Sequence, residues 1–155
     1  MKTSVRILNW PWEEPERLVL KKDYVWDSGK RGVNWKSKDG FLVIVDGVWT
    51  IKAGYVWDDA TFAWSGPKDK KTGYPQIAFA TLIHDVGYGY LNIFNPKKFP
   101  YTREEIDKYF YDEMNKVDFP LADEYYSVVK KVGGTFKIIS NILKFFGIIK
   151  DRKKS

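Results

Sequence analysis

Hydrophobic residues in the first third of the chain form short runs separated by turn-forming residues. Two of these runs, Phe41–Val45 and Val48–Ile51, are rich in β-branched and aromatic side chains and flank the dipeptide Asp46-Gly47. Aspartate and glycine both tolerate the positive φ that a two-residue turn between twisted strands requires. The pattern therefore predicts a β-hairpin with a type I′ turn.

Weaker patterns of the same kind surround this hairpin. Strands are expected at Arg17–Leu20 and at Asp23–Trp26, and a turn is expected at Lys38-Asp39-Gly40. Residues 1–62 should thus be mainly β-structure. Residues 63–75 are rich in glycine, proline and lysine, and this composition predicts a loop.

The hydrophobic period changes to three and four residues after this loop. Apolar positions recur at that spacing from near Gln76 to about Tyr90 and again from Pro120 to Lys131, which predicts two helices. Between them, Thr102 and Glu105 form the Thr-x-x-Glu pattern of a capping box, which marks the start of another helix. Residues 76–132 are therefore expected to form a helical core.

The segment 135–150 is predicted to be an amphipathic terminal helix followed by a basic tail. A narrow polar stripe interrupts its surface of isoleucine, leucine and phenylalanine; the stripe consists of Lys137, Ser140, Asn141 and Lys144. Such a helix suits a membrane interface, a partner protein or its own domain, and the pattern does not choose among them.

Together these elements predict an α+β fold in a single domain, residues 1–155. Amino-terminal antiparallel β-hairpins or a meander would be followed by the helical core and the amphipathic helix. A chain of 155 residues with 44% hydrophobic content is long enough for one extensive core.

The composition restricts the chemistry. The chain has no cysteine, so disulfides are excluded, and any metal must be held by oxygen ligands and at most one imidazole. The formal net charge of +6 favours an anionic partner, either phospholipid or nucleic acid, although no recognised nucleic-acid motif accompanies it. No secretory signal or membrane span is visible in the sequence, so the cytoplasm of the producing cell is the expected location.

The only histidine of the chain, His84, is followed directly by Asp85. A second carboxylate, Asp107, shares one helical stripe with Phe110 and Met114. A carboxylate on an apolar stripe needs a hydrogen-bonded partner when it is buried, and His84 is the only imidazole that could provide one. Such a pair would fix the imidazole tautomer and let His84 activate a water molecule for hydrolysis.

A hydrolase of this kind also needs an electrophile for the developing oxyanion, and a bound divalent cation would serve. Asp85 would supply one ligand, and Asp58 and Asp59 could add a carboxylate and a backbone carbonyl. Oxygen ligands with loose geometry suit Ca²⁺ better than Mg²⁺.

Several runs resemble the helices of prokaryotic secreted phospholipases A₂, in the same order: His84–Tyr88, Ile106–Met114 and Tyr125–Gly133. The segments Trp57–Thr61 and Gly66–Pro75 are similar to the calcium loop of that family. The resemblance implies a phospholipase A₂-like helical core. It also implies that His84 is the general base, Asp107 its orienting carboxylate, and Asp58, Asp85 and the Asp59 carbonyl the Ca²⁺ ligands. Tyr88 and Tyr109 are expected to support the site. Because that family uses disulfides, packing must hold the helices together here.

A second resemblance covers more of the chain. The loop Gly54–Asp58, the His-Asp-x-x-Tyr helix and the Asp-x-x-Phe helix are similar to an uncharacterised family of bacteriophages and prophages, domain of unknown function thirteen fifty-three. This likeness implies a viral or prophage origin, and a virion is then an expected location beside the cytoplasm of the producing cell.

Two functions therefore remain open. The first is a Ca²⁺-dependent phospholipase that acts on anionic membranes, and the second is a non-enzymatic virion, tail or host-interaction protein on the same scaffold. A metal-dependent phosphohydrolase of the His-Asp class is disfavoured, since that class needs several histidines. Nucleic-acid binding is not expected.

Overall fold

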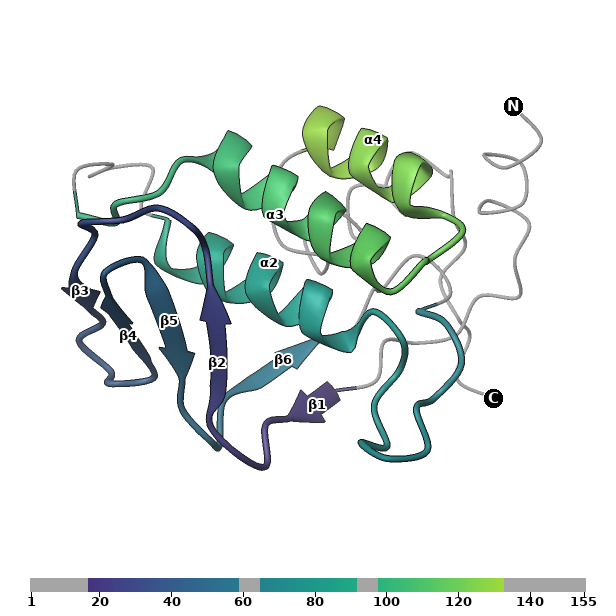
Figure 1. Cartoon of the computed structure of the whole chain (residues 1–155), viewed down its shortest axis with the longest axis horizontal. Coiled ribbons are helices and arrows are strands. Elements are labelled where there is room, and N and C mark those ends of the chain that lie inside the picture. The colour runs from purple at the N-terminus through teal and green to yellow at the C-terminus, as the bar shows by residue number, and fades with distance from the viewer. Residues whose placement is uncertain (1–16, 59–64, 92–97, 133–155) are drawn as a thin grey trace, which may run out of the picture.

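The computed structural model describes residues 17–58, 65–91 and 98–132, and the remaining residues are the grey trace of Figure 1. Within this part six strands precede three helices: β1 (Arg17–Val19), β2 (Tyr24–Asp27), β3 (Trp35–Lys36), β4 (Leu42–Val45), β5 (Val48–Ile51), β6 (Val56–Asp58), α2 (Ala78–Tyr90), α3 (Arg103–Lys116) and α4 (Ala122–Val132). The expected α+β class is confirmed. The predicted terminal helix at 135–150 lies outside the described residues.

The strands form two antiparallel sheets rather than one meander. One sheet has the order β2-β5-β4-β3, and the other pairs β1 with β6. The predicted hairpin is present between β4 and β5: Asp46 and Gly47 have φ values of 48° and 78°, as a type I′ turn requires. The two-residue strand β3 was not predicted, because so short a run carries no visible alternation.

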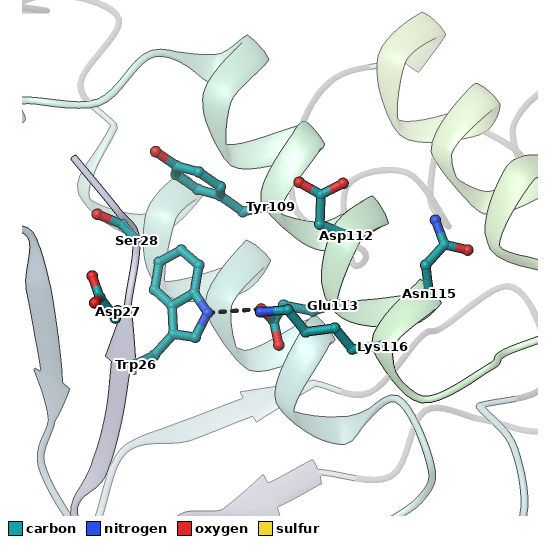
Figure 2. Close-up of a pocket in the computed structure, with 8 residues that line it drawn as sticks. All are labelled: Trp26, Asp27, Ser28, Tyr109, Asp112, Glu113, Asn115 and Lys116. Atoms are coloured by element: carbon teal, nitrogen blue, oxygen red, sulfur yellow. Dashed lines mark hydrogen bonds and ion pairs between the residues drawn. The ribbon is translucent and has the colours of Figure 1, made fainter.

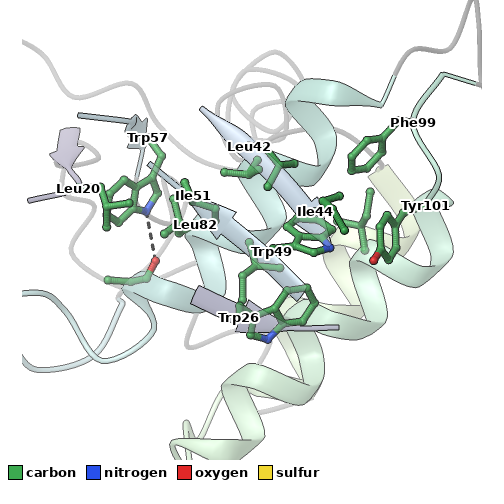
Figure 3. Packing of buried hydrophobic residues seen from close by; sticks show 14 of the residues in the cluster. Leu20, Trp26, Leu42, Ile44, Trp49, Ile51, Trp57, Leu82, Phe99 and Tyr101 are labelled. Carbon is green, nitrogen blue, oxygen red and sulfur yellow. Dashed lines mark hydrogen bonds between the residues drawn. The ribbon is translucent and has the colours of Figure 1, made fainter. Parts of the chain in front are cut away.

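The layers follow from which faces are apolar. The inner face of the larger sheet is buried and consists of Trp26, Leu42, Ile44, Trp49 and Ile51 (Figure 3). Helix α2 contacts both β6 and α3, and α3 contacts α4 (Figure 1). A helix between two layers must be apolar on most sides, and α2 accordingly contains the longest apolar stretch among the three helices.

The residues next to each helix start determine where α2 and α3 begin. The capping box of α3 is present: Glu105 N donates to Thr102 Oγ1 at 3.2 Å, and Thr102 N donates to Glu105 Oε1 at 3.0 Å. Helix α2 begins at Ala78, two residues later than expected, because Ile77 has the non-helical φ and ψ of −101° and 18°.

Helices α2 and α3 pack closely against each other. A Cβ atom added to Gly87 would lie 2.8 Å from Ile106 Cγ2, so the two helices touch at this glycine. Among the described helices none is long and apolar enough to cross a bilayer.

Candidate functional site

The predicted pairing of His84 with Asp107 is present at the contact between α2 and α3. His84 Nε2 lies 3.0 Å from Asp107 Oδ1, and the hydroxyl of Tyr88 donates to the same oxygen at 2.7 Å. His84 and Tyr88 are four residues apart, so both project from one face of α2 toward α3. Their rings stack with centroids 4.4 Å apart. One buried carboxylate oxygen is therefore shared by two donors from the neighbouring helix.

A further contact reaches the other oxygen of Asp107. Arg103 Nε lies 3.8 Å from Asp107 Oδ2, and Arg103 Nη2 donates to the Lys130 carbonyl of α4 at 2.6 Å. We call His84, Tyr88, Arg103 and Asp107 the His84 cluster. It joins all three described helices. Arg103 was not among the site residues expected from the sequence, although an arginine four residues before an aspartate on one helix is a recognisable pairing signal.

The environment of the cluster sets its protonation. His84 is 0% exposed, and this burial lowers the pKa of its imidazole, while the hydrogen bond and charge of Asp107 act in the opposite direction. Burial and then the hydrogen bond to Asp107 raise the pKa of Tyr88, so its hydroxyl stays protonated and donates. A carboxylate only accepts hydrogen bonds, so the neutral imidazole of His84 carries its proton on Nε2, the nitrogen that faces Asp107. Nδ1 is then the nitrogen that can accept a proton.

Asp85 is half-buried. Burial first, and then the charge of Asp85, raise the pKa of the Tyr55 hydroxyl, which lies near Asp85. Asp58 ends β6, where its backbone is opposite Arg17, and Asp59 lies outside the described residues. Among the described residues no group of three or more His, Asp and Glu side chains is gathered that could hold a metal ion. The calcium ligand set stays a prediction.

Tyr109 does not join the His84 cluster. It lies on another face of α3 and packs against Trp26 of β2 at a ring-centroid distance of 4.9 Å. Burial, followed by the charge of Glu105, raises the pKa of Tyr109 to about 12. Tyr109 thus packs against the sheet, and its supporting role at the dyad stays a prediction.

Tyr109 and Trp26 line a pocket of about 510 Å³ between β2 and α3 (Figure 2). Trp26 Nε1 donates to Glu113 Oε1 at 2.9 Å. Each carboxylate of this pocket already meets a cation; the pairs are Asp27 with Arg31, Asp112 with Lys108, and Glu113 with Lys116. No sequence pattern indicated the pocket, because its walls come from segments far apart in the chain. Its charges are compensated, and no member of the His84 cluster lines it.

Among the sites expected from the sequence, the structure thus brings together His84, Asp107 and Tyr88, places Asp85 beside them on α2, and directs Tyr109 elsewhere. Comparison with known proteins identifies no relative: the chain matches no protein-family model, no curated protein and no solved structure.

Proposed function

We propose that the protein hydrolyses glycerophospholipid esters, with His84 as general base and Asp107 as its orienting carboxylate. The observation that carries the proposal is the pair of hydrogen bonds that Asp107 Oδ1 accepts from His84 and Tyr88, at 3.0 and 2.7 Å. They hold the imidazole in one tautomer and one orientation. That is the arrangement a histidine needs to act as a base of defined geometry.

We propose the following reaction for this arrangement. Nδ1 of the neutral His84 takes a proton from water, and the resulting hydroxide attacks the ester carbonyl carbon. The imidazolium is stabilised by the Asp107 carboxylate, 3.0 Å from Nε2. Collapse of the tetrahedral intermediate breaks the bond to the glycerol oxygen, which takes the proton back from Nδ1. Because His84 is fully buried, water and lipid reach it only when the structure around it opens, and turnover includes that step.

Calcium is the cation we propose for the oxyanion. The available donors are oxygens, which suits Ca²⁺; Asp85 and Asp58 would supply carboxylates and Asp59 its carbonyl. A bound Ca²⁺ would polarise the ester carbonyl.

A second function is favoured by one observation. His84 is completely buried, and the His84 cluster ties α2 to α3 and, through Arg103, to the end of α4. A polar network of this kind also serves a non-enzymatic virion, tail or host-interaction protein, where it would fix how the helices pack.

Fatty-acid release from mixed anionic phospholipid vesicles tests the proposal. Wild type should release fatty acid with Ca²⁺ and not with chelator, and Asp107→Asn should lower kcat by about 10²- to 10⁴-fold because the base loses its orienting charge. Asp112→Asn is the matched control, since Asp112 lies on the same helix but pairs with Lys108. It should leave the rate unchanged.

Folding must be measured in parallel. If wild type with a cooperative unfolding transition releases no fatty acid at any Ca²⁺ concentration, the hydrolase is excluded. A loss of stability in Asp107→Asn without any wild-type activity would leave the structural role of the cluster.

A further inference from the structure

Two exposed valines lie side by side on the outer face of the smaller sheet. Val19 and Val56 are directly opposite each other in the β1–β6 register and are 50% and 43% exposed. Side chains alternate along a strand, and the neighbouring cross-strand pair, Leu18 and Trp57, is buried on the opposite face. The two valines therefore form an apolar spot on the outer face, where solvent would favour polar side chains.

Lysines flank this spot on two sides. Lys21 and Lys22 follow β1 in the turn to β2, and Lys70 and Lys71 lie in the loop of residues 65–75. All four are exposed, and none of them forms an ion pair within the described part of the chain. In Figure 1 the β1–β2 turn and the loop lie along the lower edge of the view, with β1 between them.

The loop is held beside β1 by specific contacts. The hydroxyl of Tyr74 donates to the Val19 carbonyl at 2.9 Å and accepts from Lys21 N at 3.3 Å. At the loop tip, Asp69 Oδ1 accepts from the backbone N–H groups of Lys71 and Thr72 at 2.7 and 3.1 Å. The two lysine pairs are thus kept at defined positions on either side of the valines.

We propose that this β1 surface, formed by Val19, Lys21, Lys22, Val56, Lys70 and Lys71, binds the surface of anionic phospholipid bilayers. Lysines gain from the negative potential of such a membrane, and exposed valines gain by entering the interface. A polynucleotide would use the four charges but would gain little from the valines, so lipid is the better complement. The inference rests on the proposed lipid hydrolysis and names the face that meets the substrate.

The surface also has a direct connection to the helix of His84. Trp57 of β6 points inward (Figure 3). Its Nε1 donates to the Ala78 carbonyl at 3.2 Å and to Thr81 Oγ1 at 3.1 Å. Thr81 lies about one helical turn before His84. A membrane that contacts the outer face of β6 would thus act on a strand that is hydrogen-bonded to α2 through Trp57.

Co-sedimentation with vesicles of ether-linked phosphatidylglycerol and phosphatidylcholine tests the surface without hydrolysis, since ether lipids have no ester to cleave. Wild type should bind these vesicles, bind weakly to ether phosphatidylcholine alone, and lose affinity as salt rises. Lys70→Gln with Lys71→Gln should weaken binding about 30-fold, from two lysines near the surface. Val19→Ser should weaken binding about fivefold, because the half of the Val19 side chain that is exposed would no longer make apolar contact with the membrane.

Matched controls separate the surface from net charge. Lys130 and Lys131 are also adjacent and exposed but lie on α4, across the helical layers from β1. Their double glutamine variant should bind like wild type, as should Val25→Ser on β2, where Val25 is 62% exposed. All substituted side chains are exposed, and the thermal transition of each variant would verify its folding.

Three results would overturn the proposal: no binding of wild type to the anionic vesicles, equal losses in the two lysine double variants, or tighter binding of a single-stranded oligonucleotide with no effect of Val19→Ser. The last result would assign the charges to a polynucleotide. Binding to ether vesicles without hydrolysis of ester lipids would refute the hydrolase and keep the surface. Hydrolysis of dispersed short-chain lipids without vesicle binding would do the reverse.

Discussion

Gly87 lies where α2 meets α3, and its replacement by alanine tests the packing that positions His84. The added Cβ would lie 2.8, 2.9 and 3.0 Å from Cγ2, Cγ1 and Cδ1 of Ile106. Carbon atoms prefer about 3.5–4.0 Å, and Ile106 is fully buried and β-branched, so it cannot rotate away. Overpacking of this kind costs about 1–3 kcal/mol, while alanine in a helix gains about 1 kcal/mol over glycine. We expect Gly87→Ala to lower the free energy of unfolding by up to about 2 kcal/mol.

A double-mutant cycle makes this expectation sharper. Ile106→Ala removes all three crowding carbons and by itself should cost about 2–5 kcal/mol. In that background Gly87→Ala meets no clash, so it should become stabilising by about 0.5–1 kcal/mol. The sign of the Gly87→Ala effect should therefore reverse between the two backgrounds.

Urea unfolding followed by tryptophan fluorescence measures each corner of the cycle, since Trp49 and Trp57 are buried. Gly89→Ala is the control on the same helix: its Cβ would meet only the Tyr55 hydroxyl, at 3.6 Å, and it should stabilise the protein. If Gly87→Ala stabilises the wild type as much as Gly89→Ala does, the close approach of α2 and α3 at Gly87 is refuted.

Three other variants or conditions test separate features. Because burial lowers the pKa of His84 below 6.5, the unfolded chain binds more protons between these two pKa values; the free energy of unfolding should therefore fall as pH drops below 6.5, by at most about 1.4 kcal/mol per pH unit, when urea unfolding of wild type is compared with His84→Gln. Gly47→Ala should cost at least about 2 kcal/mol in thermal unfolding, since Gly47 has a φ of 78° and its Cβ would lie 2.2 Å from the Lys30 carbonyl oxygen. Thr102→Ala should cost about 1 kcal/mol by loss of the capping hydrogen bond from Glu105 N, measured by urea unfolding.

Each of these expectations has a control. The pH dependence is assigned to His84 because the chain has no other histidine, and an identical slope in His84→Gln would contradict the assignment. Gly40 has a similar φ of 81° but open space around it, so Gly40→Ala should cost less than Gly47→Ala; equal costs would show that the Lys30 contact is unimportant. Thr102→Ser keeps the accepting hydroxyl, and a loss as large as that of alanine would argue against the cap.

Features that depend on neighbouring residues were predictable from the sequence. The type I′ turn at Asp46-Gly47 and the capping box of Thr102 and Glu105 each need only residues a few positions apart, and both are present. The pairing of His84 with Asp107 was also predictable, although it joins two helices. With a single imidazole in the chain and a carboxylate on an apolar stripe, the number of ways to satisfy the buried charge was small.

Features that depend on how distant segments pack were not predictable in this way. The same helix carries Asp107 toward α2 and Tyr109 toward β2, and only the packing of α3 against both elements gives these two residues different surroundings. The link from Arg103 to the α4 carbonyl, the full burial of His84 and the meeting of β1 with the loop of residues 65–75 have the same origin. Periodicity tells which side of an element is apolar, but the partner that covers each side is chosen by the free energy of the whole packed core.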